Sequence, residues 1–368
     1  MKYYPNYPIN QPVSLSIAFL LMVGSVGGVI VTADKTTAQT VVAVTGKIEW
    51  KPPGGTRFNP VSKNMTLLQG SLLRLSQGAT VTISCPDGRS SPWSTQGTAG
   101  LTQICPPART ISGRSITPRN GGAQDIPYTI LPRATEILTP QPILRWNAAT
   151  GTNSFTLTVR GDGLSWTQKV KRANTCQEQT CEFVYPGQPT LQPSVAYRFV
   201  IDADNGRSSS EESTAGLGFK LLDATLATEV REVRDRIITQ NLPEPSNALA
   251  IANLYTSYNL IAEALQTLEA IPTTERTAEV HRLLGDLYRQ IGLSQEAEVQ
   301  YLAAIQQAKT TNNPFELAAA QSGLGEVNYA LGRRETAVQL LQSAKRGYEA
   351  LGDVEQVTRL KKRLMKIT

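Results

Sequence analysis

The stretch Glu279–Ala304, EVHRLLGDLYRQIGLSQEAEVQYLAA, sets the fold of the C-terminal part of this chain. Small and aromatic residues recur in it at helical spacing, with a glycine near the middle. The residues of the pattern are Leu284, Gly285, Tyr288, Gly292, Ala297, Tyr301 and Ala304. The pattern predicts two helices packed as an antiparallel hairpin, because glycine and alanine let helices approach closely while tyrosines fill the space between them.

Similar hairpins are expected on both sides of this stretch. Aligned on Gly285, the equivalent positions are Ala252 and Gly325, which lie 33 residues before it and 40 residues after it. The pattern resembles the tetratricopeptide repeat (TPR), whose period is about 34 residues, and the resemblance implies a solenoid of stacked hairpins. The longer second spacing predicts a longer connection at Lys309–Asn313. Upstream, the hydrophobic period of Ala224–Ile238 predicts one more helix.

Short runs of alternating polar and apolar residues before Asp223 predict β-structure. The segment Leu191–Tyr197, LQPSVAY, resembles the tyrosine corner of fibronectin type III domains. In that family the tyrosine hydroxyl bonds back to the backbone near a Leu-x-Pro turn. The resemblance implies a β-sandwich with Trp146 in its core.

A second resemblance lies nearer the N-terminus, where the chain is similar to the FecR-like envelope domain. The matching residues are Gly46, Leu68, Gly70, Leu73, Gly78, Ala79, Asp87 and Gly88. The chain departs from the family at Gly70-Ser71, where an acidic residue usually follows the glycine. Because only 12 residues precede the apolar run at Val13, we do not expect the cytoplasmic segment through which family regulators contact a sigma factor. Within this module we expect strands, including one at Leu101–Cys105 that pairs near Cys85.

These patterns predict a multidomain chain, β then α, with two small all-β modules followed by an α-helical TPR solenoid. The expected parts are a signal peptide or N-terminal anchor over 1–38, a FecR-like β domain over 39–105, an Arg/Gly/Pro-rich linker over 106–130, a fibronectin III/Ig-like β-sandwich over 131–222, a linker helix over 224–245, three TPR-like helical hairpins over 246–352, and a C-terminal capping helix over 353–368.

Export is expected from two features. Val13–Thr32 runs 20 residues without a charge, which is typical either of a cleaved signal peptide or of an uncleaved membrane anchor. The chain has four cysteines, and they group as the local pairs Cys85–Cys105 and Cys176–Cys181. Of three possible pairings this is the most economical, and structural disulfides are typical of oxidising compartments. The protein is therefore expected in the periplasm or cell envelope.

The positive charge of the chain is concentrated near its N-terminal end. Residues 39–133 contain 10 Lys/Arg and 3 Asp/Glu, whereas the whole chain has a net charge of +6. Such a surface suits an anionic polymer, although it is also consistent with a solvated basic face. Arg109, Arg114, Arg119 and Arg133 are interpreted as residues of a solvated linker. Because export is expected, nucleic acid is not expected as a partner, and a membrane contact is expected only if the N-terminal segment stays uncleaved.

No catalytic or metal-binding motif is present. The chain has no GxSxG, HExxH, P-loop or dinucleotide-binding pattern. Its single histidine, His281, falls at a packing position of the hairpin pattern. We therefore expect no enzymatic activity, no cofactor and no metal.

Partner binding is expected on the concave face of the solenoid, which the first helices of the hairpins line. The residues that helical spacing directs there are Glu279, Arg282, Asp286, Arg289, Gln290, Ser322, Glu326, Tyr329, Asn253, Thr256 and Ser257. The expected function is a non-catalytic envelope adaptor that holds a protein or peptide in this groove. Two alternatives remain: a membrane-anchored sensor that resembles FecR regulators, and a cell-wall or polysaccharide-binding protein, or envelope hydrolase, that uses Trp50, Trp93 or Trp166.

Overall fold

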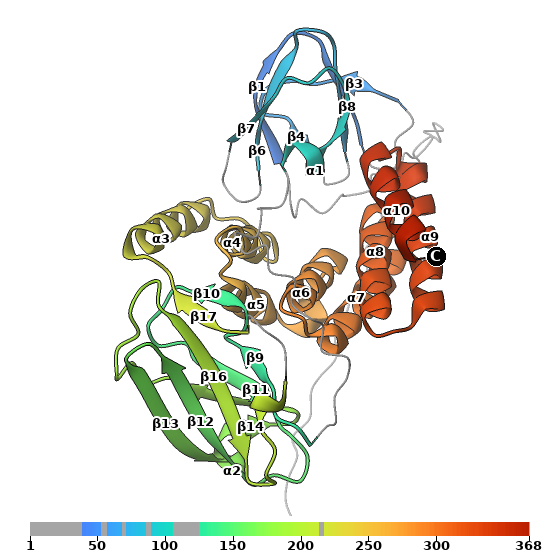
Figure 1. Cartoon of the computed structure of the whole chain (residues 1–368). Helices are drawn as coiled ribbons and strands as arrows, with labels where there is room; N and C mark the ends of the chain where they lie inside the picture. The colour runs from blue at the N-terminus through green and yellow to red at the C-terminus, as the bar shows by residue number, and fades with distance from the viewer. Residues whose placement is uncertain are drawn as a thin grey trace, which may run out of the picture. The chain divides into compact units, whose positions relative to one another are not determined.

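The structure is a computed structural model that describes residues 39–52, 57–67, 71–85, 90–105, 125–212 and 217–367. Strands form the N-terminal part of the described chain and helices form the C-terminal part (Figure 1). The predicted order, β then α, is confirmed. The predicted signal or anchor segment 1–38 lies outside the described residues, as do residues 106–124 of the predicted linker, with Arg109, Arg114 and Arg119.

The N-terminal module consists of two small sheets. Its elements are β1 (Gln39–Thr45), β2 (Ile48–Lys51), β3 (Asn59–Pro60), β4 (Thr66–Leu67), β5 (Leu72–Leu75), β6 (Thr80–Ser84), β7 (Ser90–Trp93), β8 (Gly97–Gly100) and α1 (Leu101–Ile104). The strand orders are β4-β1-β6-β7 and β3-β2-β5-β8, and all pairs are antiparallel. Gly46 has φ +80°, and a Cβ there would lie 2.9 Å from the Ala79 Cα, so this turn requires glycine. Leu68, Gly70, Asp87 and Gly88 of the FecR-like pattern lie outside the described residues.

The prediction of a strand at Leu101–Cys105 was wrong, because Leu101–Ile104 is the short helix α1. The strand before this helix, β8, pairs with β5 and ends at Gly100. The helical turn that follows buries Leu101 and Ile104 in the core of the module. It also brings Cys105 to Cys85, and the two form a disulfide with a Cα–Cα distance of 5.6 Å.

The second β module is a sandwich. Its elements are β9 (Thr129–Leu131), β10 (Thr135–Ile137), β11 (Ile143–Asn147), β12 (Ser154–Gly161), β13 (Leu164–Lys171), α2 (Arg172–Thr175), β14 (Cys176–Gln177), β15 (Thr180–Val184), β16 (Ala196–Ala203), η1 (Ser209–Glu211) and β17 (Phe219–Leu221). One sheet has the order β10-β17-β16-β12-β13 and the other β14-β15-β11-β9. β9 begins within residues that the sequence assigned to the linker, because Thr129 and Leu131 pair with β11.

The core of the sandwich contains the tryptophan that the sequence placed there. Trp146 is fully buried and packs edge-on against Phe155 and Phe199. The backbone N–H of Gln192 donates to the Tyr197 hydroxyl at 2.8 Å, which is the bond expected of a tyrosine corner.

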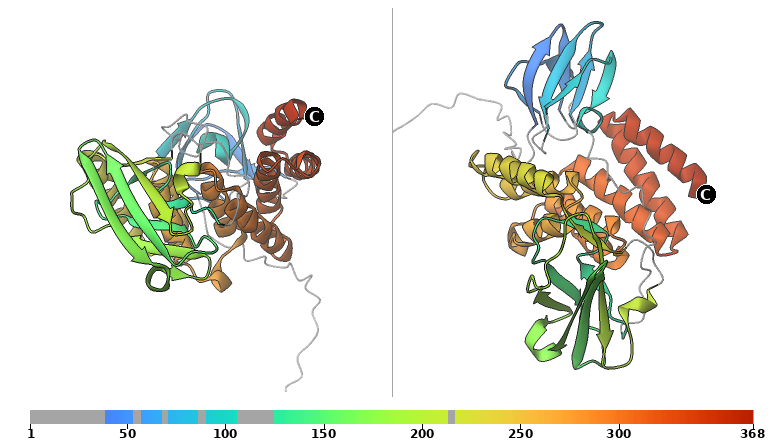
Figure 2. Two further views of the ribbon diagram at one scale, coloured as in Figure 1. Left: turned by 60° about the horizontal axis from the view of Figure 1, so that its bottom comes forward. Right: turned by 60° about the vertical axis from the view of Figure 1, so that its left-hand side comes forward.

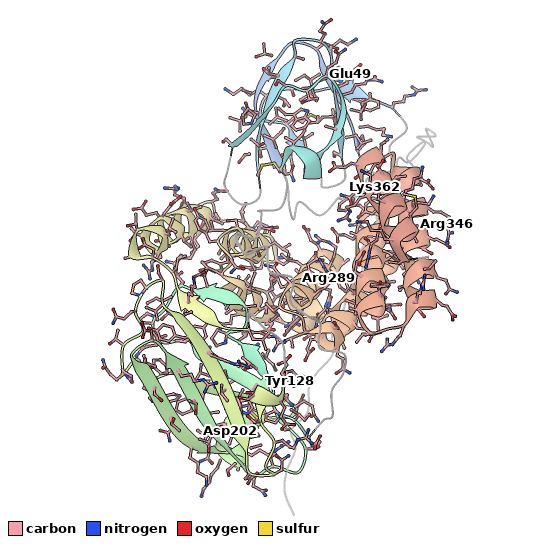
Figure 3. The ribbon with its side chains drawn as sticks, in the orientation of Figure 1. Glu49, Tyr128, Asp202, Arg289, Arg346 and Lys362 are labelled. Carbon is pink, nitrogen blue, oxygen red and sulfur yellow. A yellow bond between two sulfur atoms is a disulfide. The ribbon has the colours of Figure 1, made fainter. Side chains whose placement is uncertain are left out.

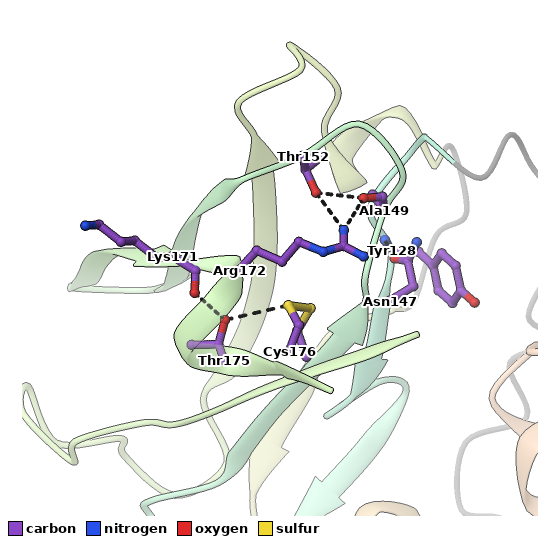
Figure 4. Close-up of a disulfide and its surroundings, with 9 residues drawn as sticks. Tyr128, Asn147, Ala149, Thr152, Lys171, Arg172, Thr175 and Cys176 are labelled. Carbon is purple, nitrogen blue, oxygen red and sulfur yellow. Dashed lines mark hydrogen bonds between the residues drawn. A yellow bond between two sulfur atoms is a disulfide. The ribbon is translucent and has the colours of Figure 1, made fainter. Parts of the chain in front are cut away.

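The second disulfide joins Cys176 and Cys181 across the paired strands β14 and β15 (Figure 4). The turn α2 leads into it, and the Thr175 hydroxyl donates to the Lys171 carbonyl at 3.0 Å. Arg172 donates to the Ala149 carbonyl at 2.7 Å and so ties this turn to the loop that follows β11. Both disulfides are the local pairs that the sequence favoured, and such bonds are typical of proteins that fold in an oxidising compartment.

The helical part consists of antiparallel hairpins. Its elements are α3 (Ala224–Ile238), α4 (Ser246–Ser257), α5 (Ile261–Glu269), η2 (Thr273–Glu275), α6 (Ala278–Gln290), α7 (Ser294–Thr310), α8 (Pro314–Ala330), α9 (Arg334–Leu351) and α10 (Val354–Ile367). The hairpins are α4–α5, α6–α7 and α8–α9, and α10 packs on α9 (Figure 2). No helix of the described ranges is both long enough and apolar enough to cross a membrane.

The extra length between the second and third hairpins lies in helices. The prediction of a longer connection at Lys309–Asn313 was wrong, because α7 continues to Thr310 and α8 begins at Pro314. The Asn313 side chain caps α8 by accepting from the Glu316 backbone N–H at 3.1 Å. Each of these two helices has 17 residues, so the longer repeat produces longer helices and keeps a short turn.

Candidate functional site

The candidate site is the side of α6, α8 and α10 that carries linked polar side chains, here called the inner face. Its members are Arg282, Asp286 and Arg289 on α6, Glu316, Glu326 and Tyr329 on α8, and Arg363 on α10. Figure 3 shows Arg289 and Arg346 on opposite sides of the helical stack. The inner face follows from the stacking of hairpins, in which the first helices of successive hairpins lie next to one another.

Arg282 joins α6 to α8. Its Nε donates to Glu316 at 2.6 Å, and its Nη1 donates to Asp286 at 2.7 Å. Burial by itself lowers the pKa of the Arg282 guanidinium, but Glu316 and Asp286 outweigh that effect and raise the pKa above its usual value. Arg282 therefore stays charged and acts as a fixed link between the two helices.

Arg289 extends this network toward solvent. The Tyr301 hydroxyl donates to Asp286 at 2.5 Å and accepts from the Arg289 Nε at 3.2 Å. Burial raises the pKa of Tyr301, and the neighbouring Asp286 charge raises it further. The Arg289 side chain remains 45% exposed, so part of its guanidinium is available to a ligand.

A second link joins α8 to α10. The Arg363 guanidinium donates to both carboxylate oxygens of Glu326, with the shortest distance 2.7 Å. It also lies over the ring of Tyr329, with its Cζ 4.4 Å from the ring centroid. Tyr329 is 41% exposed, so the stacked pair presents an aromatic edge beside a cation.

Several residues predicted to project into the groove do not do so. Glu279 and Ser322 are buried, and Arg282 is largely buried by its ion pairs. Helical spacing directed them to the correct side, but neighbouring helices approach closely enough to cover them.

The predicted residues of the first hairpin are half-buried. On α4, Thr256 donates to the Ala252 carbonyl and Ser257 donates to the Leu254 carbonyl, whereas Asn253 is half-buried without a link to the inner-face network. Gln290, at the end of α6, is also half-buried. The part of the candidate site that reaches solvent is thus made by the exposed Arg289 and Tyr329 and by the half-buried Asp286, Glu326 and Arg363.

His281 lies between the two helices of its hairpin. Its Nδ1 is 2.9 Å from the Gln300 side-chain oxygen on α7. Burial lowers the pKa of the imidazole below its usual value. Within the described ranges, no group of His, Cys, Asp and Glu is arranged to hold a metal ion.

Sequence reasoning missed an interface between the sandwich and the first two hairpins. Arg133, interpreted as a solvated linker residue, is completely buried. Its guanidinium forms a two-pronged ion pair with Glu212, at 2.6 and 2.8 Å. Its Nε donates to the carbonyl of Ile291, the residue that follows α6, at 2.7 Å. A single arginine in a run of Arg, Gly and Pro gives no sign that it is buried, so only the structure reveals this contact.

Further polar contacts support the same interface. Arg145 on β11 pairs with Glu269 on α5, and the Tyr288 hydroxyl of α6 donates to that same carboxylate. The backbone N–H of Leu138 donates to Glu263 on α5 at 2.5 Å. The contacts reach the ends of α5 and α6 and leave the exposed inner-face residues out.

The basic N-terminal module uses part of its charge internally. Arg74 on β5 donates to Glu49 on β2 at 2.7 Å and lies 4.1 Å from the centroid of the Phe58 ring. Lys51 lies 5.8 Å from the same ring. The three tryptophans considered for polysaccharide binding are half-buried. Trp50 and Trp93 pack against the core of this module, and Trp166 packs against the core of the sandwich.

Comparisons with known proteins add little to this description. No protein-family model matches the chain, and no curated protein matches it. One solved structure, a TPR-domain containing protein from Parabacteroides distasonis, aligns over 86% of this chain and 91% of that chain, with 9% sequence identity and a TM-score of 0.20. A TM-score this low carries no argument, so the fold is described from its own helices and strands.

Proposed function

We propose that this protein is a non-catalytic, exported adaptor of the cell envelope that binds a segment of a partner protein on its inner face. The proposal rests on the two ion pairs that hold the helices of this face in place. Arg282–Glu316 joins α6 to α8, and Arg363–Glu326 joins α10 to α8. A face held by such links changes little when a ligand arrives, so less conformational freedom is lost on binding.

Two exposed residues of the inner face are suited to anchor a partner. Arg289 and Tyr329 belong to residue types that contribute most to binding energy at protein interfaces. Each is fixed from one side, Arg289 by the Tyr301 hydroxyl and Tyr329 by the Arg363 guanidinium. The other side of each is open to solvent.

Export is supported by the two disulfides, which an oxidising compartment favours. The uncharged run Val13–Thr32 would supply the signal. The N-terminal residue of the native protein, determined by mass spectrometry, tests whether that run is removed. A start after Ala33 or Ala38 agrees with a released adaptor, whereas an intact N-terminus would instead favour an anchored protein.

The binding proposal is tested by cross-linking in the native host. The full chain is compared with an Arg289→Glu/Tyr329→Ala variant and with Arg346→Glu, an exposed arginine on α9 that is remote from the inner face. We expect one cross-linked partner to be lost from the inner-face variant and kept by the Arg346 control. Equal capture by all three proteins would show that the inner face is not the binding surface.

A further inference from the structure

We infer that the segment bound at the inner face is an acidic stretch of polypeptide. It would contact Arg289 on α6 and a cationic stripe of α10, defined as Arg359, Arg363 and Lys366. The inference rests on the proposed function and adds to it the chemistry of the partner. It is carried by an excess of cations on α10 that the chain itself does not neutralise.

α10 is strongly basic. Its sequence, VEQVTRLKKRLMKI, contains five cations and one carboxylate. Among the described residues, Arg363 is the only one of these cations that forms an ion pair. Arg359, Lys361, Lys362 and Lys366 are all exposed. Cations late in a helix interact favourably with its dipole, but that effect falls off beyond the last turn, and of these five cations only Lys366 lies in the last turn.

The stripe lies along the inner-face side of α10. Arg359, Arg363 and Lys366 are spaced by four and three residues, so they share one side of the helix. Arg363 shows the direction of that side, because it reaches Glu326 and Tyr329 on α8. The core-facing side is marked by Val357, Leu360 and Ile367, which are buried. Lys361 lies on the other flank of the core-facing side, away from the stripe.

The carboxylates of the inner face already have partners within the chain. Glu316 is committed to Arg282, Glu326 to Arg363, and Asp286 to Arg282 and the Tyr301 hydroxyl. Asp286 also forms a longer ion pair with Arg289, at 3.9 Å. The remaining exposed carboxylate of the stripe is Glu355, one turn before Arg359, and it forms no ion pair with any described residue. Cations therefore outnumber the available carboxylates on this side, and an acidic ligand would balance them.

A polypeptide suits this surface better than a membrane does. Arg363 is only 28% exposed, and Arg289 is held down by the Tyr301 hydroxyl. Arg363 already uses its Nε and Nη2 on Glu326, so a ligand carboxylate has to reach the remaining Nη1 of this half-buried group, which a narrow polypeptide does more readily than a flat lipid surface. The Tyr329 ring, stacked against Arg363 of the stripe and 41% exposed, offers an apolar contact to residues that flank an acidic side chain.

The test uses the full chain with its disulfides intact and a short fluorescent peptide in which Glu alternates with Leu. A peptide with Gln in place of every Glu is the matched ligand, and phosphatidylglycerol vesicles represent a membrane. We expect the Glu peptide to bind, and binding to weaken as salt is added. Arg359→Glu and Lys366→Glu should each weaken it by about three- to tenfold, on the scale of exposed ion pairs that turn repulsive. Lys361→Glu carries the same charge change and should leave affinity within about twofold.

The outcomes separate the inference from the function on which it rests. If the Glu and Gln peptides bind equally, or if Lys361→Glu weakens binding as much as Arg359→Glu, the partner is not selected for acidity. If neither peptide binds but the native cross-link still depends on Arg289 and Tyr329, the inference fails and the function stands. If the cross-link does not depend on them, the proposed function fails. Binding to vesicles that needs Arg359, without binding to the Glu peptide, would assign the stripe to a lipid surface and overturn the inference.

Discussion

Arg133 illustrates how far a single residue can depart from what its sequence neighbours suggest. It follows a stretch rich in Arg, Gly and Pro, yet both it and its partner Glu212 are buried. Glu212 in turn lies in a serine-rich stretch whose sequence gives it no special position. A buried ion pair contributes little compared with an apolar replacement, but removing one partner leaves an uncompensated charge in the interior.

Glu212→Ala should therefore destabilise the protein strongly. We expect a loss of about 3–5 kcal/mol in the free energy of unfolding, because the Arg133 guanidinium would remain buried without its carboxylate. The measurement is urea denaturation followed by circular dichroism. Glu182→Ala is the control, since Glu182 pairs with Arg145 at a position where its side chain is 47% exposed, and the expected loss is below about 1 kcal/mol. Equal losses would show that the Arg133 site is open to water.

Glu263 is a second residue whose surroundings change a property of its side chain, here the pKa of the carboxyl group. Its Oε1 accepts from Leu138, whereas its Oε2 is shielded from solvent and has no partner among the described residues. Burial raises the pKa of this carboxyl from 4.5 to about 7, and the Leu138 hydrogen bond opposes the rise. Between these two pKa values the folded chain binds more protons than the unfolded chain, so the free energy of unfolding falls as pH rises through that range.

Glu263→Gln should remove this pH dependence. The variant keeps a neutral side chain at all pH values, so its stability relative to wild type should increase by roughly 2–3 kcal/mol between about pH 4.5 and about pH 8. The measurement is the urea midpoint of both proteins across this range, and the difference between them cancels the other titrating groups. A constant difference at every pH would mean that Glu263 titrates normally.

At the scale of elements, the helical hairpins depend on close approaches around Tyr301. A Cβ on Gly285 of α6 would lie 2.9 Å from the Tyr301 ring, and one on Gly323 of α8 would lie 2.3 Å from it. The sequence pattern predicted the close approach at Gly285, but the pattern did not single out Gly323. The reason is that the contact at Gly323 joins α8 to the preceding hairpin, and its existence depends on how hairpins stack.

Gly323→Ala should destabilise the helical part, although alanine is the better helix former by about 1 kcal/mol. Tyr301 is fully buried and hydrogen-bonded to Asp286 and Arg289, so its ring has little room to move. We expect a net loss of about 1–3 kcal/mol in thermal or urea unfolding. In a Tyr301→Leu background the same substitution should cost less, because the smaller side chain leaves space. If Gly323→Ala destabilises the Tyr301→Leu protein by the same amount, the clash does not involve the Tyr301 ring.

At the scale of the whole molecule, the sandwich and the first hairpins share one hydrophobic core. Ile130, Leu131 and Leu138 of the sandwich lie in the same cluster as Val230 of α3 and Leu265 of α5. The helix α3, expected to be a linker, buries Ala227 and Ile237 in that cluster as well. Because the shared core exposes apolar surface if either part unfolds, we expect the two parts to unfold together.

Leu265→Ala tests this coupling. Leu265 is fully buried, and its truncation should cost about 2–5 kcal/mol. In a chain with Trp50→Phe and Trp93→Phe, the remaining tryptophans, Trp146 and Trp166, report on the sandwich, while far-ultraviolet circular dichroism reports mainly on the helices. Both urea transitions should shift together. Leu302→Ala, at an exposed position of α7, is the control and should shift neither transition. If Leu265→Ala shifts the helical signal alone, the sandwich and the helices unfold separately.

The sequence by itself determined the order of β modules and helices, the helical hairpins, the local cysteine pairs and the buried Trp146. All of these follow from short-range patterns: hydrophobic period, turn residues and nearby partners. Only the tertiary structure decided that Arg133 is buried, that Arg282 and Glu279 are covered, and that the exposed site narrows to Arg289, Tyr329 and their neighbours. Burial and pairing across 79 residues, as in Arg133–Glu212, depend on how separate elements dock, and no local pattern encodes that.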